Sequence, residues 1–507
     1  MPPRAGLALG LLLTLMGGPF ALWALRPGPA APATVRGHVT DAHGSLAGAR
    51  VRWKATALTA ETDALGRFRL PARPGAGRIT AWKDGFLIAG ANSAQTPLNL
   101  RLSLLPAEDN EAYEWVDPAP GPAGAHNCAN CHAEIYREWA ASGHSRSATG
   151  QRFRNLYEGT DWHGKPGVGW GLVNEHPDGI AVCASCHAPA LPDGDPALFD
   201  LRKLDGVAAQ GVHCDYCHKV AGLAGGTVGL THGRYNLRLL RPAEGQLFFG
   251  PLDDVDRGED AYTPLYRDSR YCASCHEGVV FGVHVYGTYT EWQASPAGRA
   301  GKQCQDCHMA PTGRMTNFAP GHGGVERDPA TLGNHRFFRG GQAKMLRDSV
   351  QVSADLRRGP DGVRAVVRVR ADGVGHRVPT GFIDRHLLLV VEGLTAEGQA
   401  LPVRTGPTLP AAAGPELAGR PGRLYAKLLR DPDGKGPVPF WHAGAEPADT
   451  RLTPGEADRA EFVFPAAVVR LRTRVLYRRF WQEVARSKGW PDRDLTVNER
   501  TFDLPAP

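Results

Sequence analysis

All ten cysteines of this chain fall into five Cys-x-x-Cys pairs, and a histidine directly follows every pair. The motifs are Cys128-Ala-Asn-Cys131-His132, Cys183-Ala-Ser-Cys186-His187, Cys214-Asp-Tyr-Cys217-His218, Cys272-Ala-Ser-Cys275-His276 and Cys304-Gln-Asp-Cys307-His308. Two thiols at this spacing can form thioethers to the two vinyl groups on one edge of a porphyrin. The adjacent histidine then gives its imidazole to the iron. The pattern therefore predicts five covalently attached haems c, each coordinated by its motif histidine.

Other cysteine sites explain the pattern less well. A zinc ribbon uses Cys-x-x-Cys units in twos, and five is an odd number. A disulfide framework or a thioredoxin-like redox pair does not require histidine after the second cysteine. Only 19 of the 507 residues are histidine, so five matches by chance are improbable. No cysteine is left for a disulfide bond.

Length and charge limit the other possibilities. A chain of 507 residues is long enough for about three domains. It has 58 Lys and Arg against 52 Asp and Glu, a net charge of +6. A balance this weak over so long a chain excludes a polybasic protein that coats nucleic acid. We therefore expect no nucleic-acid partner.

The N-terminus predicts export from the cytoplasm. Residues 5–25 form an apolar run behind Arg4, and the triplet Ala31-Pro32-Ala33 resembles a cleavage site. Residues 1–33 therefore read as a secretory signal peptide. Because the apolar run is long, an uncleaved N-terminal membrane anchor is the alternative. Either interpretation predicts a periplasmic or otherwise extracytoplasmic protein, secreted or membrane-anchored, where haem is attached covalently to thiols.

Residues 34–105 predict a small N-terminal β-sandwich. The stretches 35–39 and 49–53 alternate in polarity around a turn at 41–44. The series Gly37-x-Val39-x-Asp41-x-x-Gly44, continued by Thr62-Asp63-x-x-Gly66-x-Phe68, resembles carboxypeptidase regulatory-like domains. That resemblance implies an antiparallel sandwich that serves as an accessory module without catalysis.

The middle of the chain predicts a loop-rich domain with short helices. A Pro- and Gly-rich linker at 106–124 precedes residues 125–346, which hold all five motifs. At this density the porphyrins themselves would form much of the apolar core. We expect helices near 133–142 and 289–294. These two stretches share a pattern, which is either an internal repeat or a coincidence: Tyr136-Arg-Glu-Trp139-Ala-Ala-Ser142-Gly-His144 and Tyr289-Thr-Glu-Trp292-Gln-Ala-Ser295-Pro-Ala297.

Residues 347–507 predict a C-terminal β-sandwich. The stretches 363–370, 387–392 and 469–475 read as strands separated by Gly- and Pro-containing loops, and a short helix is expected near 480–487. The predicted fold class is therefore multidomain, with a β-sandwich on each side of a loop-rich and helical multihaem domain.

The sixth ligand of each iron decides its role, because a second histidine gives a low-spin electron-transfer site and an open position admits a substrate. Met is an improbable donor, since few methionines follow residue 33. We set aside His38, His43, His386 and His442 as turn or strand residues. The remaining histidines outside the motifs are His126, His144, His163, His176, His213, His232, His284, His322, His335 and His376. These candidates outnumber the five irons, so counting histidines does not reveal whether one iron has an open coordination position.

Residues 125–346 resemble the multihaem cytochromes of the cytochrome c554 and c-prime type. The resemblance rests on the five motifs, on Trp139-x-x-Ser142-x-His144, on Asn334-His335-Arg-Phe-Phe-Arg-Gly-Gly341 and on Gly375-His376-Arg-Val-Pro-Thr-Gly381. It implies that His144, His335 and His376 are distal iron ligands. His232 and His284 are further candidates. His126 and His213 stand close to motifs and compete with packing roles, and the other three candidates are more typical of loops.

Three functions are compatible with this sequence. The first is an electron carrier between redox proteins, either other cytochromes or a membrane quinol-oxidising complex. The second is an oxidoreductase that acts on hydroxylamine or nitrite at one five-coordinate haem. Ammonia-forming nitrite reductases use a CxxCK motif, which is missing here. Hydroxylamine oxidoreductases carry more haems. In the third, the two β domains carry the function by binding a partner or a surface. We favour the electron carrier.

Overall fold

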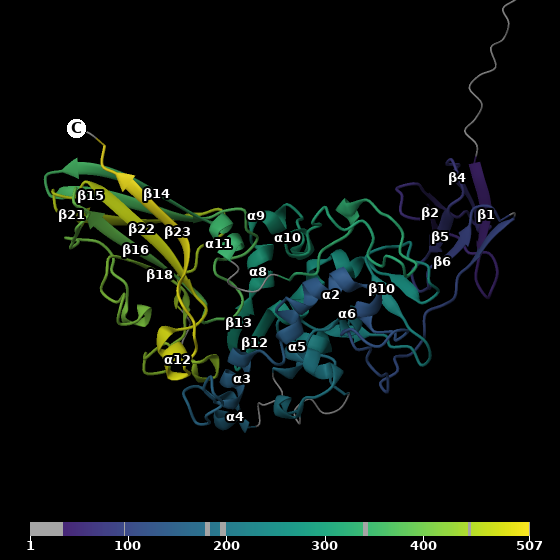
Figure 1. The fold of residues 1–507 in the computed structure, drawn as a ribbon, viewed down its shortest axis with the longest axis horizontal. Coiled ribbons are helices and arrows are strands. Elements are labelled where there is room, and N and C mark those ends of the chain that lie inside the picture. The colour runs from purple at the N-terminus through teal and green to yellow at the C-terminus, as the bar shows by residue number, and fades with distance from the viewer. Residues whose placement is uncertain are drawn as a thin grey trace, which may run out of the picture.

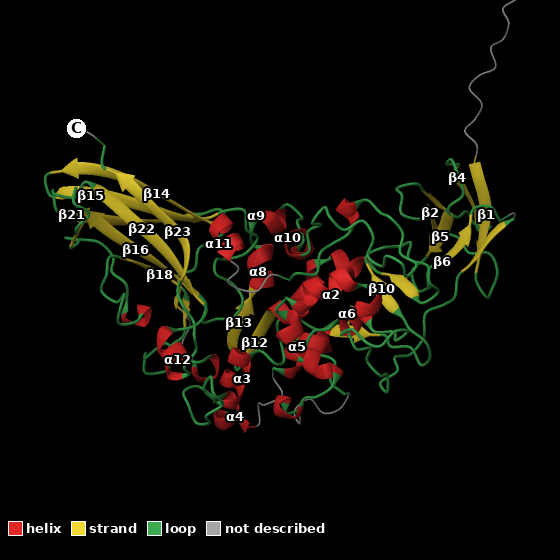
Figure 2. Ribbon diagram, viewed as in Figure 1, coloured by secondary structure: helices red, strands yellow, loops and turns green. Residues whose placement is uncertain are grey.

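The computed structural model describes residues 34–95, 97–177, 183–192, 199–337, 343–444 and 448–505. The molecule is elongated, with strand-rich regions at both ends and short helices and loops between them (Figures 1 and 2). This confirms the predicted three-part organisation, while the exact boundaries at 105, 124 and 346 stay predictions. The predicted signal peptide or anchor lies outside the described residues. Among the residues that are described, no helix has the length and apolarity needed to cross a membrane.

The N-terminal region consists of two small sheets around one core. Its strands are β1 (Thr34–Thr40), β2 (Arg50–Trp53), β3 (Thr59–Glu61), β4 (Arg67–Pro71), β5 (Arg78–Trp82), β6 (Ala89–Asn92) and β7 (Leu98–Arg101). The sheet orders are β4-β1-β7 and β3-β2-β5-β6. Alternate residues such as Val51, Phe68 and Leu100 face inward and are buried. One pairing departs from the antiparallel expectation, because β1 and β7 are parallel and are joined by a crossover through the other strands.

An acidic loop of the central region holds the N-terminal sheets in place. Asp253 pairs with Arg52, and the buried Asp256 carboxylate pairs with Lys54 at 2.6 Å and also with Arg78. Between them, Asp254 accepts a hydrogen bond from the backbone N–H of Ala55 at 2.7 Å. The N-terminal region is therefore docked through charge pairs with acids that are themselves 7% exposed or less.

The central region has short elements, and its largest described apolar cluster also includes C-terminal residues such as Phe440 and Trp441. Its helices are α1 (Cys128–Cys131), α2 (Ala133–Ala140), α3 (Gln151–Glu158), α4 (Leu172–Glu175), α5 (Ala184–His187), α6 (Cys214–His218), α7 (Ser269–His276), α8 (Thr288–Gln293), α9 (Pro296–Arg299) and α10 (Cys304–His308). Two-stranded ladders join β8 (Val220–Leu223) to β9 (Leu237–Leu239), β10 (Phe248–Gly250) to β11 (Asp260–Tyr262), and β12 (Glu277–Val280) to β13 (Val283–Gly287). The expected helices near 133 and 289 are α2 and α8.

The C-terminal region consists of two larger sheets that share one apolar core. Its longer elements are α11 (Ala343–Ser349), β14 (Val350–Gly359), β15 (Gly362–Ala371), β16 (His386–Leu394), β21 (Ala457–Phe464), β22 (Arg470–Arg478), α12 (Gln482–Ser487) and β23 (Leu495–Asp503). Short strands complete it: β17 (Ala400–Leu401), β18 (Gly422–Tyr425), β19 (Lys427–Leu428) and β20 (Ala448–Asp449). The sheet orders are β14-β15-β21 and β17-β16-β22-β23. Val367 from one sheet and Val475 from the other lie in the same fully buried cluster.

Candidate functional site

Each of the five cysteine motifs lies on a short helix or extends one residue beyond it, namely α1, α5, α6, α7 or α10. A separation of three residues brings both cysteines to one helix face. The thiols are partly buried, with the exception of Cys307, which is exposed. This arrangement leaves each pair of sulfur atoms free to bond one ligand edge, as the sequence predicts for haem c.

Three motif histidines are held in a single tautomer by backbone carbonyls. The Nδ1 atom of His132 lies 2.8 Å from Phe318 O, that of His187 2.7 Å from Ser147 O, and that of His218 2.6 Å from Phe249 O. A carbonyl only accepts, so Nδ1 carries the proton and Nε2 keeps a free lone pair. Histidines that bind metal are oriented in this way.

Two motif histidines face a second histidine at the distance that one shared metal requires. The ring centroids of His144 and His276 are 6.3 Å apart, and those of His308 and His376 are 6.1 Å apart. Two imidazoles that each bind one metal at about 2.0 Å place their centroids about 6 Å apart. Burial lowers the pKa of His144 to about 3 and that of His276 to about 4. These imidazoles are therefore neutral, the form that a metal binds.

His335 is also placed near motif histidines. Burial lowers its pKa to about 3, and the neighbouring His218 and then His132 contribute to that shift. Its backbone N–H donates to Glu138 Oε2 at 2.8 Å. Its Nδ1 atom is buried and makes no hydrogen bond to the described residues. This histidine is thus available as a ligand between the first and third motifs.

The last two candidates differ from each other. His232 precedes the motif-facing turn 233–236, and its buried Nδ1 has no hydrogen-bond partner among the described residues. The Nε2 atom of His284 instead lies 2.5 Å from Glu277 Oε1, and the His284 side chain is 40% exposed. A carboxylate occupies the coordinating edge of His284, so we leave it out of the ligand set proposed below.

The motifs themselves are close neighbours. The Cys128 thiol is the main cause of the raised pKa of Cys214, Cys186 has the same effect on Cys275, and Cys304 on Cys272. Cys217 of the third motif lies near enough to Cys272 and Cys275 to raise both values further. The five motifs therefore form one connected cluster.

Aromatic rings line three motif histidines. Phe153 stacks on His187 with centroids 4.0 Å apart, Tyr266 lies 5.6 Å from His218, and Phe318 lies 5.9 Å from His132. Sequence reasoning missed these partners and the carbonyl acceptors. Backbone carbonyls carry no residue signature, and lone aromatic residues are indistinguishable from core residues in sequence. With paired thiols, neutral imidazoles and apolar walls, the residues present fit haem c.

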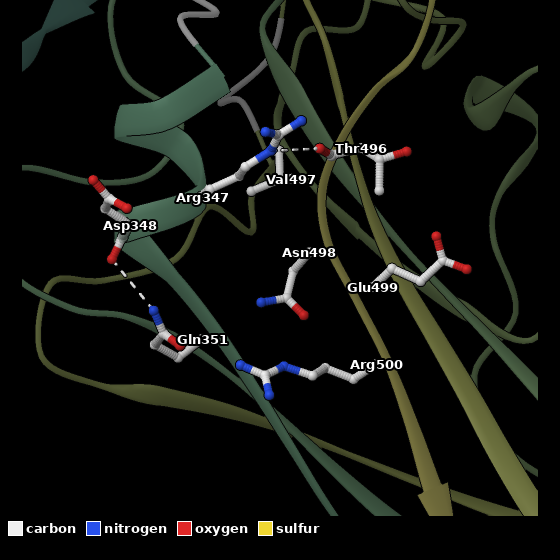
Figure 3. A pocket seen from close by; sticks show the side chains of 8 residues that line it. All are labelled: Arg347, Asp348, Gln351, Thr496, Val497, Asn498, Glu499 and Arg500. Atoms are coloured by element: carbon white, nitrogen blue, oxygen red, sulfur yellow. Dashed lines mark hydrogen bonds between the residues drawn. The ribbon is translucent and has the colours of Figure 1, made fainter.

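A separate hollow of about 630 Å³ lies between α11 and β23 in the C-terminal region (Figure 3). Its lining is mostly polar and charged, with Arg347, Asp348 and Arg500 among the residues drawn. No motif residue and no candidate iron ligand lines it. This hollow is therefore not part of the candidate site.

Comparison with known proteins gives a match for part of the motif cluster. Residues 127–219, which hold the first three motifs, match the family described as cytochrome c554 and c-prime. Residues 127–219 are therefore similar to multihaem cytochromes of this type. The chain is also similar to a solved structure, the penta-heme cytochrome c552 from Thermochromatium tepidum. The identity is 23% and the TM-score 0.52, covering 74% of this chain and 97% of the other. That likeness shows a shared fold. No curated protein matches the chain.

The match covers the first three motifs and does not include the fourth and fifth. The N-terminal sheets are not part of the matched range of 127–219. Their resemblance to carboxypeptidase regulatory-like domains stays a prediction.

Proposed function

We propose that this protein is a multihaem c-type cytochrome that carries five covalently attached haems c and passes electrons between redox partners outside the cytoplasmic membrane. The observation that carries the proposal is the pairing of His276 with His144 and of His308 with His376, at 6.3 and 6.1 Å. Two histidines on one iron give a low-spin, six-coordinate site suited to electron transfer rather than to substrate binding. When bound, haem c supplies an iron that alternates between the ferric and ferrous states.

The protein's own residues would keep that coordination unchanged in both states. Carbonyl acceptors fix the ring orientation of His132, His187 and His218. The opposed histidines come from distant segments, so the folded chain and not local flexibility sets their separation. These features favour a carrier whose sites are preorganised.

The contacts among motifs support a continuous route for electrons. The first motif meets the third, the third lies near the fourth, and the fourth meets both the second and the fifth. The exposed Cys307 brings the fifth motif to the surface. We propose this motif as a port for exchange with a partner, either another cytochrome or a membrane quinol-oxidising complex.

Haem counting and electron paramagnetic resonance (EPR) test the proposal. A pyridine haemochrome assay of the purified holoprotein should give five haems per chain, and a value of three or fewer overturns the assignment. The EPR spectrum of the oxidised protein should contain low-spin signals only. A high-spin signal that shifts on adding nitrite or hydroxylamine would instead support the alternative, an oxidoreductase with one five-coordinate haem.

A further inference from the structure

Helices α2 and α8 make the same contacts, although they lie far apart in the sequence. Both carry the pattern Tyr-x-Glu-Trp-x-x-Ser noted above. The Trp139 indole N–H donates to Val212 O at 2.8 Å, and the Trp292 indole N–H donates to Lys302 O at 2.7 Å. Each acceptor stands two residues before the first cysteine of a motif, the third in one case and the fifth in the other. The shared letters therefore reflect a shared structure.

The thiols show the same correspondence. In the first copy the Cys128 thiol lies beside that of Cys214, and in the second the Cys272 thiol lies beside that of Cys304. In both copies the contact joins the first cysteines of two motifs. One motif directly precedes the helix, and the other directly follows the carbonyl that accepts the indole hydrogen bond. The first and third motifs thus form one unit with α2, and the fourth and fifth form an equivalent unit with α8.

The glutamate in the pattern has an equivalent task in each unit. Glu138 Oε2 accepts the backbone N–H of His335 at 2.8 Å, and Glu138 Oε1 accepts Arg336 Nε at 2.9 Å. Glu291 Oε2 accepts the backbone N–H of Arg377, next to His376, at 3.2 Å. Both carboxylates are only 9% exposed. Each carboxylate therefore accepts a backbone hydrogen bond from the segment that carries a candidate distal histidine.

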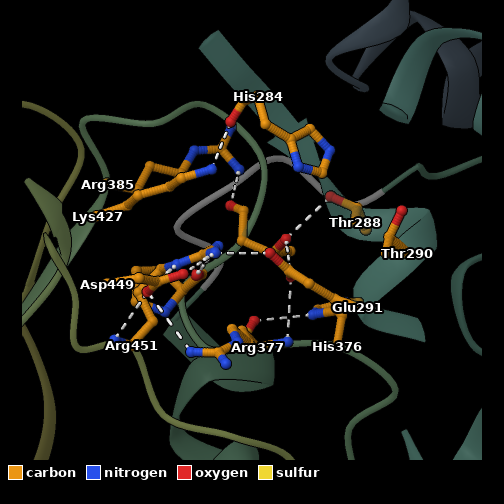
Figure 4. A network of polar contacts seen from close by, with 12 residues as sticks. His284, Thr288, Thr290, Glu291, His376, Arg377, Arg385, Lys427, Asp449 and Arg451 are labelled. Atoms are coloured by element: carbon orange, nitrogen blue, oxygen red, sulfur yellow. Dashed lines mark hydrogen bonds and ion pairs between the residues drawn. The ribbon is translucent and has the colours of Figure 1, made fainter. Parts of the chain in front are cut away.

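The second unit has an additional connection to the C-terminal region (Figure 4). Glu291 Oε2 also accepts the Thr380 hydroxyl at 2.8 Å, and Glu291 Oε1 pairs with Arg451 at 2.7 Å. Arg451 is 8% exposed and pairs in turn with Asp449. Figure 4 shows Glu291 of α8 close to His376, with Arg451 and Asp449 beside it. Removing one partner of a buried ion pair of this kind is strongly destabilising, because it leaves the other charge uncompensated.

We propose that Glu138 and Glu291 are equivalent positioning residues in an internally duplicated two-haem unit, each fixing the segment that supplies a sixth iron ligand. His376 serves the iron held by His308, and by equivalence His335 serves the iron held by His218. This inference rests on the proposed function, because it requires haem at both motifs. It assigns His335 to the third motif rather than to the first.

The duplication is incomplete at one position. His144 of the first copy lies opposite His276 of the second, but the residue equivalent to His144 in the second copy is Ala297. The duplicated unit therefore supplies no reciprocal ligand for His132. Glu138 and Glu291 act only on the irons held by His218 and His308.

The test compares matched variants of the full-length holoprotein by haem content, ferric EPR and spectroelectrochemical titration. Glu291→Ala should alter the same low-spin signal that His376→Ala removes, about one fifth of the low-spin intensity for five haems. Glu138→Ala should alter the signal that His335→Ala removes. The Glu→Gln variants keep an oxygen acceptor for the backbone N–H and should retain the low-spin signals. Glu134→Ala, an exposed change on α2, is the control and should change nothing.

If an alanine variant does not fold, Glu→Asp replaces it, because a shorter side chain withdraws the carboxylate and should still shift the same signal. Wild-type spectra in the Ala or Asp variants, with five haems present, overturn the positioning role. So does a Glu138 variant that alters the His376 signal. A wild-type protein with three haems or fewer, or without low-spin signals, contradicts the proposed function instead, so the two failures are distinguishable.

Discussion

Lys219, directly after α6, and Asp215, within it, form an ion pair in which both side chains are completely shielded from solvent, at 0% exposure each. The pair spans the proximal ligand candidate His218. Asp215 Oδ2 also accepts the Tyr113 hydroxyl at 3.0 Å and the Val116 N–H at 2.8 Å. The segment 106–124, predicted as a linker, is thus tied to the third motif.

Asp215→Asn should strongly destabilise the holoprotein. The amide keeps the size of the side chain but leaves the Lys219 ammonium buried without an opposite charge, which costs about 3–5 kcal/mol. Guanidinium unfolding would measure the loss. The matched control is Lys344→Ala, which breaks the pair with Asp348 at 86% and 63% exposure and should cost less than about 1 kcal/mol. A loss below about 1 kcal/mol for Asp215→Asn would contradict the buried-pair argument.

Asp384 should make the C-terminal region less stable as the pH rises. Burial raises the pKa of Asp384 to about 8, whereas the unfolded chain has a value of about 3.9. Between these values the folded protein keeps a proton that the unfolded chain releases, so the stabilisation is complete below about pH 4 and is lost on approaching pH 8. Asp384→Asn should remove this loss. Between pH 5 and pH 8 its free energy of unfolding should rise by about 2 kcal/mol or more relative to that of wild type.

Denaturant unfolding curves at pH 5 and pH 8 test this prediction. Asp372→Asn, at an exposed position of the same region, is the control and should leave the pH dependence as it is in wild type. Parallel pH profiles for wild type and Asp384→Asn would show that the buried carboxyl is not the source.

Replacing His144 should change the potential of one haem. In His144→Met a thioether takes the place of the imidazole opposite His276, and methionine ligation raises the potential, here by on the order of 100 mV. Spectroelectrochemical titration should show one of the transitions displaced upward. His163→Met, on an exposed loop, should have no such effect. An unchanged titration of His144→Met would remove His144 from the ligand set.

The acidic loop should determine how firmly the N-terminal region is docked. Asp256→Ala deletes the shared partner of Lys54 and Arg78, and hydrogen exchange in β2 should accelerate about tenfold or more, corresponding to about 1.4 kcal/mol. Gly90→Ala tests the same contact without changing charge, because a Cβ there would lie 1.7 Å from Asp256 Oδ2. Asp63→Ala removes an exposed pair with Arg67 in the same region and should leave exchange in β2 unchanged.

The parts of this protein that can be predicted from sequence are those with a local signature. The haem motifs are contiguous, and the strand expected at 363–370 is observed as β15, Gly362–Ala371, because its alternation reflects a half-buried face. The helix near 289 is likewise observed as α8. In these cases neighbours along the chain carry the information.

The parts that sequence does not predict depend on distant partners. Asp256 resembles any acid in a solvated loop until its pairing with Lys54, 202 positions away, is known. His284 counts as a spare histidine until the β12–β13 hairpin places it on Glu277. The repeated pattern of α2 and α8 is ambiguous in sequence, because a match over only seven positions can arise by chance. The equivalent indole and carboxylate contacts distinguish a repeat from chance.

The position of His376 along the chain bears on the order in which the protein matures. All five cysteine motifs precede it, and so does His335. Covalent attachment needs only the thiols of each motif, so it can finish before the segment with His376 has docked beside Glu291. The fifth iron would then receive its second imidazole only when the C-terminal region is in place. Its spin state would report on whether a newly made chain has completed assembly.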